Sequence, residues 1–79
     1  YPNPFNPITT LLFEIPEKAN IKLLLYDVTG RLIELFVDKE MNAGQYVINF
    51  NGSKYGSGIY FYRLITENYN ETKKMVLIK

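Results

Sequence analysis

The sequence contains no cysteine and no histidine among its 79 residues. Without cysteine, disulfide bridges and thiolate metal sites are excluded. Without histidine, the chain has neither the commonest general base nor the commonest zinc ligand. No apolar run approaches the roughly 18 residues that cross a bilayer as a helix. We therefore expect no catalytic residue, no metal, no cofactor and no transmembrane segment.

A strong excess of charge is also missing. Nine basic and eight acidic residues give a net charge of +1, and the basic residues are scattered except for the adjacent Lys73 and Lys74. Nucleic-acid-binding proteins carry clustered basic surfaces because counterion release drives their affinity, so we expect no nucleic-acid partner. With 47% hydrophobic and 22% charged residues, the composition is that of an ordinary globular domain, and the length is enough for one.

Alternation of apolar and polar residues is the dominant pattern along the chain, and it is typical of β-strands. It predicts strands at 9–15, 21–26, 31–37, 45–51, 59–66 and 72–79, although the spacing at 31–37 also suits a helix. Turns or loops are expected between them, at 17–20, 27–30, 38–44, 52–58 and 67–70. Strands about every ten residues predict an all-β, immunoglobulin-like β-sandwich of six to seven antiparallel strands.

Two segments have a more specific expectation. Three prolines in the first seven residues predict an extended lead-in over 1–8, with Phe5 packed on the domain. Asp27 precedes Gly30 by three residues, without the alternating acidic residues that build a calcium loop. We therefore expect Asp27 to form an Asx-type turn, in which its carboxylate accepts backbone N–H groups and Gly30 has a positive φ.

The predicted strand at 59–66 is apolar on both faces. This pattern is typical of a central strand that is buried on one side and largely covered on the other. Because Arg63 alternates with them, Tyr60, Tyr62 and Leu64 are expected to point into the core.

Lysines flank the apolar centre of the last predicted strand. They are Lys73, Lys74 and Lys79. They could guard an edge strand against aggregation, or they could be a recognition signal at the end of the chain.

Three stretches, in this order and spacing, closely resemble the type A C-terminal sorting domains of the type IX secretion system. They are residues 1–7 with Thr9 and Thr10, residues 25–31, and residues 57–64 followed by 72–79. The structural motifs of that family correspond by position to Asn3, Pro4, Phe5, Asp27, Gly30, Gly58 and Tyr60. Its basic C-terminal strand corresponds to Lys73, Lys74 and Lys79.

The resemblance implies a single sorting domain over 1–79, folded as a seven-stranded immunoglobulin-like sandwich and cut from the end of a larger secreted protein. It implies an N-terminal cargo domain in the same chain, which reaches the periplasm by its own signal. An outer-membrane type IX translocon would recognise the sorting domain, and a sortase-like protease would often remove it. The cargo would then be secreted or held at the cell surface.

Two alternatives remain open. The immunoglobulin-like domain of the flagellar hook-capping protein is similar in its Pro-Asn-Pro-Phe lead-in and Gly-x-Tyr strand, but it usually carries an Asp- and Gly-rich insert that is missing at 51–57. It would be a structural module. A carbohydrate-binding accessory module would use exposed tyrosines such as Tyr55 and Tyr69, and exposed, coplanar rings would favour it.

Overall fold

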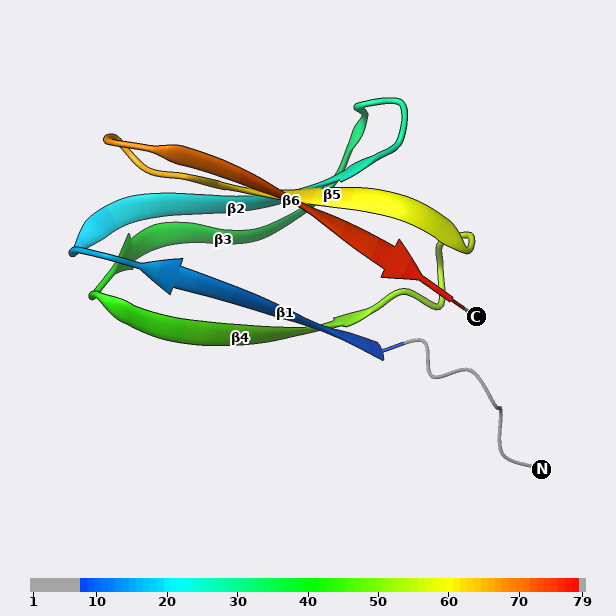
Figure 1. The fold of residues 1–79 in the computed structure, drawn as a ribbon, viewed down its shortest axis with the longest axis horizontal. Helices are drawn as coiled ribbons and strands as arrows, with labels where there is room; N and C mark the ends of the chain where they lie inside the picture. Colours follow the sequence, from blue (N-terminus) through cyan, green and yellow to red (C-terminus); the bar gives the residue numbers. More distant parts are fainter. Residues whose placement is uncertain (1–7, 79) are drawn as a thin grey trace.

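The computed structural model describes residues 8–78, which form six strands in two layers (Figure 1). The strands are β1 (Ile8–Ile15), β2 (Ala19–Asp27), β3 (Leu32–Met41), β4 (Gly44–Asn51), β5 (Gly58–Ile65) and β6 (Asn70–Leu77). One layer is the β1–β4 pair, and the other is a four-stranded sheet with the order β3-β2-β5-β6. Every pairing is antiparallel. The predicted all-β, immunoglobulin-like sandwich is confirmed.

The core lies between the two layers and follows the period-two pattern of the strands. In β2, for example, Leu23 and Leu25 are completely buried, whereas Lys22 is exposed. Burying one such aliphatic side chain contributes about 1.5–3 kcal/mol. The other buried apolar side chains come from both sheets: Leu11, Phe13, Ile15, Ala19, Ile21, Phe50, Tyr60, Leu64, Met75 and Leu77. Tyr62 is half-buried against them, so the predicted inward side of β5 is confirmed.

Tyrosine hydroxyls also connect the layers. The Tyr62 hydroxyl, from β5, donates to the carbonyl oxygen of Leu12 in β1 at 3.3 Å. The Tyr69 hydroxyl, from the β5–β6 turn, donates to the carbonyl oxygen of Glu14 at 2.9 Å. Each ring thus has an apolar body in the sandwich and a polar end on the backbone of the opposite layer.

The loop predicted at 38–44 is wrong, because β3 continues to Met41 and β4 begins at Gly44. Asp38 pairs with Lys22 of β2, and Glu40 pairs with Asn20. The polar run suggested a loop, but β3 is an edge strand. There, charged side chains can face solvent while the backbone keeps its ladder.

Two turns also differ from their expected bounds: the first is shorter, and the second begins and ends one residue earlier. Ala19 is buried and already belongs to β2, so the first turn ends before it. At the other connection, the amide of Thr66 donates to the carbonyl oxygen of Tyr69 at 2.8 Å. This bond closes the turn early, and Asn70 pairs with Ile65 as the first residue of β6.

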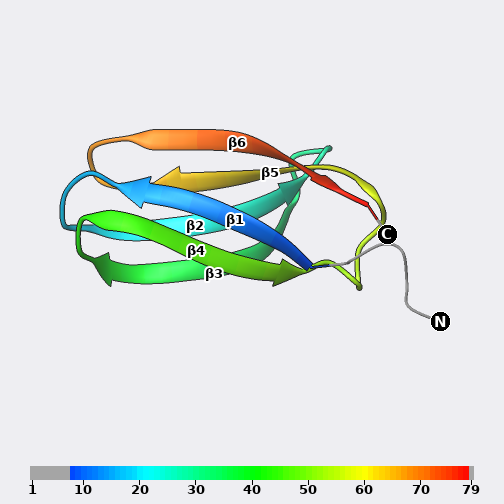
Figure 2. The ribbon, with the colours of Figure 1, turned by 60° about the horizontal axis from the view of Figure 1, so that its bottom comes forward.

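The two ends of the described chain lie at the same end of the sandwich (Figures 1 and 2). Ile8 pairs with Asn51, and Leu77 pairs with Gly58. Both pairs flank the loop at 52–57, which joins one layer to the other.

Candidate recognition surface

β6 is an edge strand with a regular backbone. It pairs with β5 without interruption from Gly58–Leu77 to Ile65–Asn70. Within residues 8–78 no strand pairs with its other edge, and Figure 2 shows β6 at the border of the four-stranded sheet. Such an edge offers unpaired N–H and C=O groups to another strand.

Lys73 and Lys74 are both exposed, but they lie on opposite faces of β6. Met75 and Leu77 are buried, so Lys73, which has the same parity, lies on the core side. Lys74 pairs with Phe61 on the outer face. The structure therefore does not bring the two lysines to one face, and Lys79 lies outside the described residues.

On the core side, Lys73 borders a surface hollow of about 460 Å³ whose lining includes Phe13, Glu14 and Tyr46. The Gln45 side-chain amide donates to Glu14 Oε2 there at 3.1 Å. Charged side chains that point inward at a sheet edge are a known protection against aggregation. The position of Lys73 fits that protective role as well as a role in recognition.

The C-terminal end of β6 is held by close packing. Leu77 is almost fully buried, and Gly52 lies directly against it. A Cβ at position 52 would be 2.6 Å from Leu77 Cδ1. Position 52 therefore has no room for a side chain, which residue spacing along the chain does not reveal.

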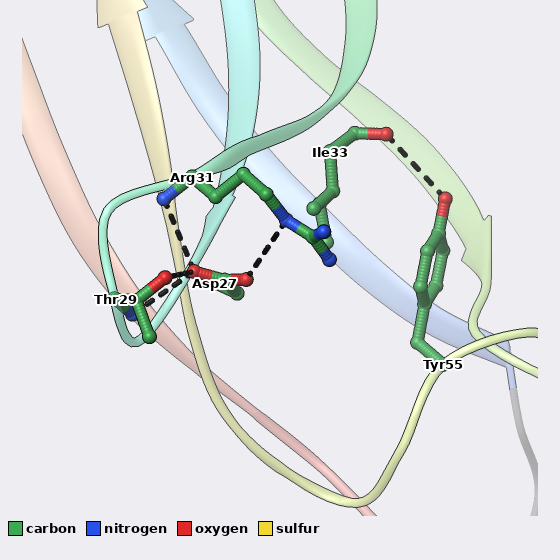
Figure 3. Close-up of polar contacts among 5 residues, drawn as sticks. All are labelled: Asp27, Thr29, Arg31, Ile33 and Tyr55. Atoms are coloured by element: carbon green, nitrogen blue, oxygen red, sulfur yellow. Dashed lines mark hydrogen bonds and ion pairs between the residues drawn. The ribbon is translucent and has the colours of Figure 1, made fainter.

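Asp27 forms the predicted Asx-type turn between β2 and β3 (Figure 3). Its Oδ1 accepts from the Thr29 amide at 2.9 Å, the Thr29 hydroxyl at 2.6 Å and the Arg31 amide at 3.1 Å. Its Oδ2 lies 3.3 Å from Arg31 Nε. The Thr29 hydrogen bond, above all, lowers the pKa of Asp27 below its ordinary value of 3.8. Gly30 has a φ of 89°, so both expectations for this turn are confirmed.

Gly58 and Tyr60 close the loop before β5. Gly58 has a φ of 148°, a region that favours glycine. The buried Tyr60 donates its hydroxyl to the carbonyl oxygen of Gly56 at 2.6 Å. Both residues thus have a structural role here. The other three motif residues, Asn3, Pro4 and Phe5, and the lead-in that contains them fall on residues outside the described part of the chain.

The two tyrosines considered for sugar binding are both half-buried. The Tyr55 ring stacks on Phe50 at a centroid distance of 5.7 Å. Its hydroxyl lies 3.5 Å from the carbonyl oxygen of Ile33 (Figure 3) and 2.8 Å from Glu34 Oε2, and the bond to Glu34 raises its pKa. Burial raises the pKa of Tyr69, whose hydroxyl is bonded to β1. The exposed, coplanar platform that would favour sugar binding is not formed by these two rings.

One surface was missed by the sequence reasoning. It is the outer face of the four-stranded sheet, where Ile59 is 44% exposed, although Phe61 and Arg63 are half-buried, as expected for a largely covered face. The neighbouring β2 places Leu24 and Tyr26 on the same side. Two adjacent strands that are apolar on both faces were the indication in the sequence.

The described part of the chain contains no cluster of metal-ligating side chains. No group of three His, Cys, Asp or Glu residues within 8–78 could hold a metal ion. No helix in the same region is long and apolar enough to span a membrane. Two features with the geometry of a binding surface are the free edge of β6 and the outer face of its sheet.

Together the two sheets and this open edge define an immunoglobulin-like β-sandwich module. A family model described as "Secretion system C-terminal sorting domain" matches residues 1–79. The chain belongs to this family, whose members are not known to be catalytic. The family implies attachment to a cargo chain, export by type IX secretion, and a secreted or cell-surface fate. Neither the curated proteins nor the solved structures contain a significant match.

Proposed function

We propose that this domain is the sorting signal by which the outer-membrane type IX translocon recognises an attached cargo after the cargo has reached the periplasm. A sortase-like protease then separates the domain from the cargo. The observation that carries the proposal is the unpaired edge of β6, a regular strand of eight residues close to the end of the sequence. Membership of the sorting-domain family supports the same role.

The mechanism is β-augmentation, in which a strand of the translocon pairs with the free edge of β6. Main-chain hydrogen bonds supply affinity, and side chains that alternate between the two faces supply register. Lys73 and Lys74 place one positive charge on each face of β6. Carboxylates of the partner strand would meet them, and a shift by one residue would exchange the two faces.

Charge reversal at Lys74 and Lys79 tests this proposal. Residues 1–79 are fused to a periplasm-directed fluorescent protein in a bacterium with type IX secretion and in a strain that lacks the translocon. We expect export in the first strain alone, and less export for Lys74→Glu with Lys79→Glu. Lys39→Glu, which changes an exposed lysine of β3, is the control and should be exported normally.

Purified variants are compared by thermal unfolding, which verifies that the fold is intact. Retention of the native fusion in the periplasm of both strains would contradict the sorting function. Unchanged export of a folded Lys74→Glu, Lys79→Glu variant would contradict the role of the lysines.

A further inference from the structure

The outer face of the four-stranded sheet, directed away from β1 and β4, carries a continuous apolar surface. We call it the outer apolar face and define it as Leu24, Tyr26, Leu32, Leu35, Ile59, Phe61 and Val76. Its members lie in three rows across the strands: Leu35 pairs with Leu24, Leu32 pairs with Tyr26, which pairs with Phe61, and Ile59 pairs with Val76. Leu32 and Leu35 are each 52% exposed, and Val76 is 53% exposed. Contiguous exposed apolar surface of this kind marks interaction sites.

A bulge in β3 gives the face part of its width. Two residues three apart in a regular strand point to opposite sides. The register shift between Leu25 and Tyr26 places Leu32 and Leu35 on the same outer side, while Ile33 and Phe36 pack on the core.

The outer face of the β1–β4 layer is different in composition. Its cross-strand pairs include Thr10 with Asn49, and Glu14 with Gln45, which are polar. Leu12 and Val47, 59% and 60% exposed, form one apolar pair among them. Ile8 of β1 is also 49% exposed on this face, so large apolar side chains are exposed on both broad faces. The outer apolar face differs in that its members adjoin one another across all four strands of the sheet.

The β2–β3 turn rises from the sheet on the side away from β1 and β4 (Figure 1). Beside this turn the outer apolar face has a hollow. The hollow has a volume of about 390 Å³, and its lining combines apolar and polar side chains, among them Tyr26, Asp27, Val28, Phe61, Arg63 and Thr72. An apolar side chain of a partner could enter it beside the Arg63 guanidinium. Buried anchors of this kind dominate the energy of protein interfaces.

Two cations beside this surface have no acidic partner. Arg63 Nε donates to Asn70 Oδ1 at 2.7 Å, a neutral group, and Lys74 adjoins Phe61 across the strands. The ion pairs formed within residues 8–78 are Lys18–Glu40 and Arg31–Asp27. Arg63 and Lys74 therefore remain available for carboxylates outside the domain.

We propose that the outer apolar face binds a protein of the export machinery, through an apolar surface that inserts one side chain into the hollow and places carboxylates against Arg63 and Lys74. This inference rests on the proposed sorting function and adds a second contact beside the free edge of β6, with Lys74 common to both. Electrostatic complementarity of this type speeds association and fixes orientation.

The hollow beside Arg63 argues against a lipid surface as the occupant, because a membrane would have no specific use for it. The charges at the far end of the face are mixed: strand parity places Asp38 and Glu40 there, but Asp38 pairs with Lys22, and Glu40 forms an ion pair with Lys18.

The charges argue against a second copy of this chain as the occupant. In a two-fold dimer, the outer apolar face of one copy would lie against the same face of the other. If the two-fold axis runs perpendicular to the strands, β5 and β6 of one copy lie against β5 and β6 of the other, so Arg63 and Lys74 face the same positively charged strands. If the axis runs parallel to the strands, β6 of one copy lies against β3 of the other at the level of Leu32 and Leu35. No carboxylate lies on the outer face there, so Lys74 would have no acidic partner.

The test uses the same fluorescent fusion with two matched double variants. Leu32→Ser with Leu35→Ser alters the outer apolar face on β3, at the opposite edge of the sheet from β6. Leu12→Ser with Val47→Ser removes similarly exposed side chains from the other broad face. We expect about a tenfold loss of export for the first pair, the equivalent of about 1.4 kcal/mol, and normal export for the second. Arg63→Glu should also reduce export, with part of it retained in Arg63→Lys.

Each outcome separates the two proposals. If the native fusion is not exported, the sorting function fails. If the native fusion is exported and the folded Leu32→Ser, Leu35→Ser variant is exported equally well, the outer apolar face has no role and this inference fails. Sedimentation of the purified native chain, and its binding to phosphatidylglycerol vesicles, test the other occupants. Dimerisation or vesicle binding that the same pair of substitutions abolishes would assign the face to a second copy or to lipid.

Discussion

The two edges of the four-stranded sheet, β3 and β6, are built differently. β3 has two register shifts against β2, carries the charged run from Asp38 to Glu40, and leads through a short turn into β4 of the other layer. β6 has no register shift, and its edge is free within the described chain. Bulges and charges are the usual ways in which proteins blunt an edge. Both edges carry charges, but only β3 is also bulged, so β6 keeps a backbone regular enough to accept a strand.

The edges also differ in what holds them. β3 follows a tight local turn in which Asp27 makes its hydrogen bonds within four residues. β6 depends on long-range packing, because its buried side chains Met75 and Leu77 belong to a core cluster with Leu11 and Phe50. A strand held by its side chains needs no second strand partner, so its edge can stay open without loss of position.

The largest loss of stability is expected from truncating Leu77, the buried side chain that holds the C-terminal end of β6. Leu77→Ala removes a buried side chain and leaves a cavity, which should lower the free energy of unfolding by about 2–5 kcal/mol. Leu35→Ala, on the exposed side of β3, should change it by less than about 0.5 kcal/mol. Urea unfolding of both variants measures the difference. Equal losses would show that β6 is not held by its core contacts.

A smaller loss of stability is expected from substituting Gly52, which lies against Leu77. Gly52→Ala would place a methyl group 2.6 Å from Leu77 Cδ1, and such overpacking typically costs about 1–3 kcal/mol. Gly56→Ala is the control, because a Cβ there meets nothing within 4 Å. Thermal unfolding should separate the two variants, and an equally stable Gly52→Ala would disprove the close contact.

The smallest effect is expected in the turn that leads into β3, and it depends on pH. Because the native turn lowers the pKa of Asp27, the contribution of this carboxylate to stability is present above the ordinary pKa of 3.8 and is lost as the pH falls through the lower, folded-state pKa. Asp27→Ala should therefore be less stable than the native chain at neutral pH, with a difference that narrows in acid.

Thermal unfolding over an acid pH series measures this effect. Asp27→Asn keeps an acceptor for the Thr29 amide, so it should lose less at neutral pH than Asp27→Ala. A native–alanine difference that stays constant into strong acid would contradict the role of the charged carboxylate.

Much of the fold could be predicted because it follows from residue patterns that are local in the sequence. Alternation identified β1, β2 and β4, and the Asp27–Gly30 turn has residues whose side chain and backbone favour that geometry on their own. β3 shows the limit of prediction from such local patterns. Its spacing suited both a helix and a strand, because a bulge sends Leu32 and Leu35 outward while Ile33 and Phe36 point inward. A bulge is fixed by the pairing with β2, which a single strand does not encode.

The candidate surfaces were less predictable for a similar reason. Lys73 and Lys74 are adjacent in sequence, yet the buried Met75 and Leu77 fix them to opposite faces, and this parity could have been read in advance. The hollow beside Arg63 could not, because its walls come from β2, β5 and β6 and from the turn before β3. The close contact of Gly52 with Leu77 likewise joins residues 25 positions apart in the sequence.

The separation of β1 and β6 into different sheets has a mechanical consequence. If a receptor holds β6 while an attached cargo pulls on β1, no ladder of paired strands joins the two directly. The load passes instead through the packed side chains between the layers and through the Tyr62 and Tyr69 hydroxyl bonds to β1. The force acts on both strands at the same end of the sandwich, so it separates the two layers progressively from that end instead of shearing the paired strands of one sheet. The domain should therefore unfold at a lower pulling force than its content of β-structure suggests.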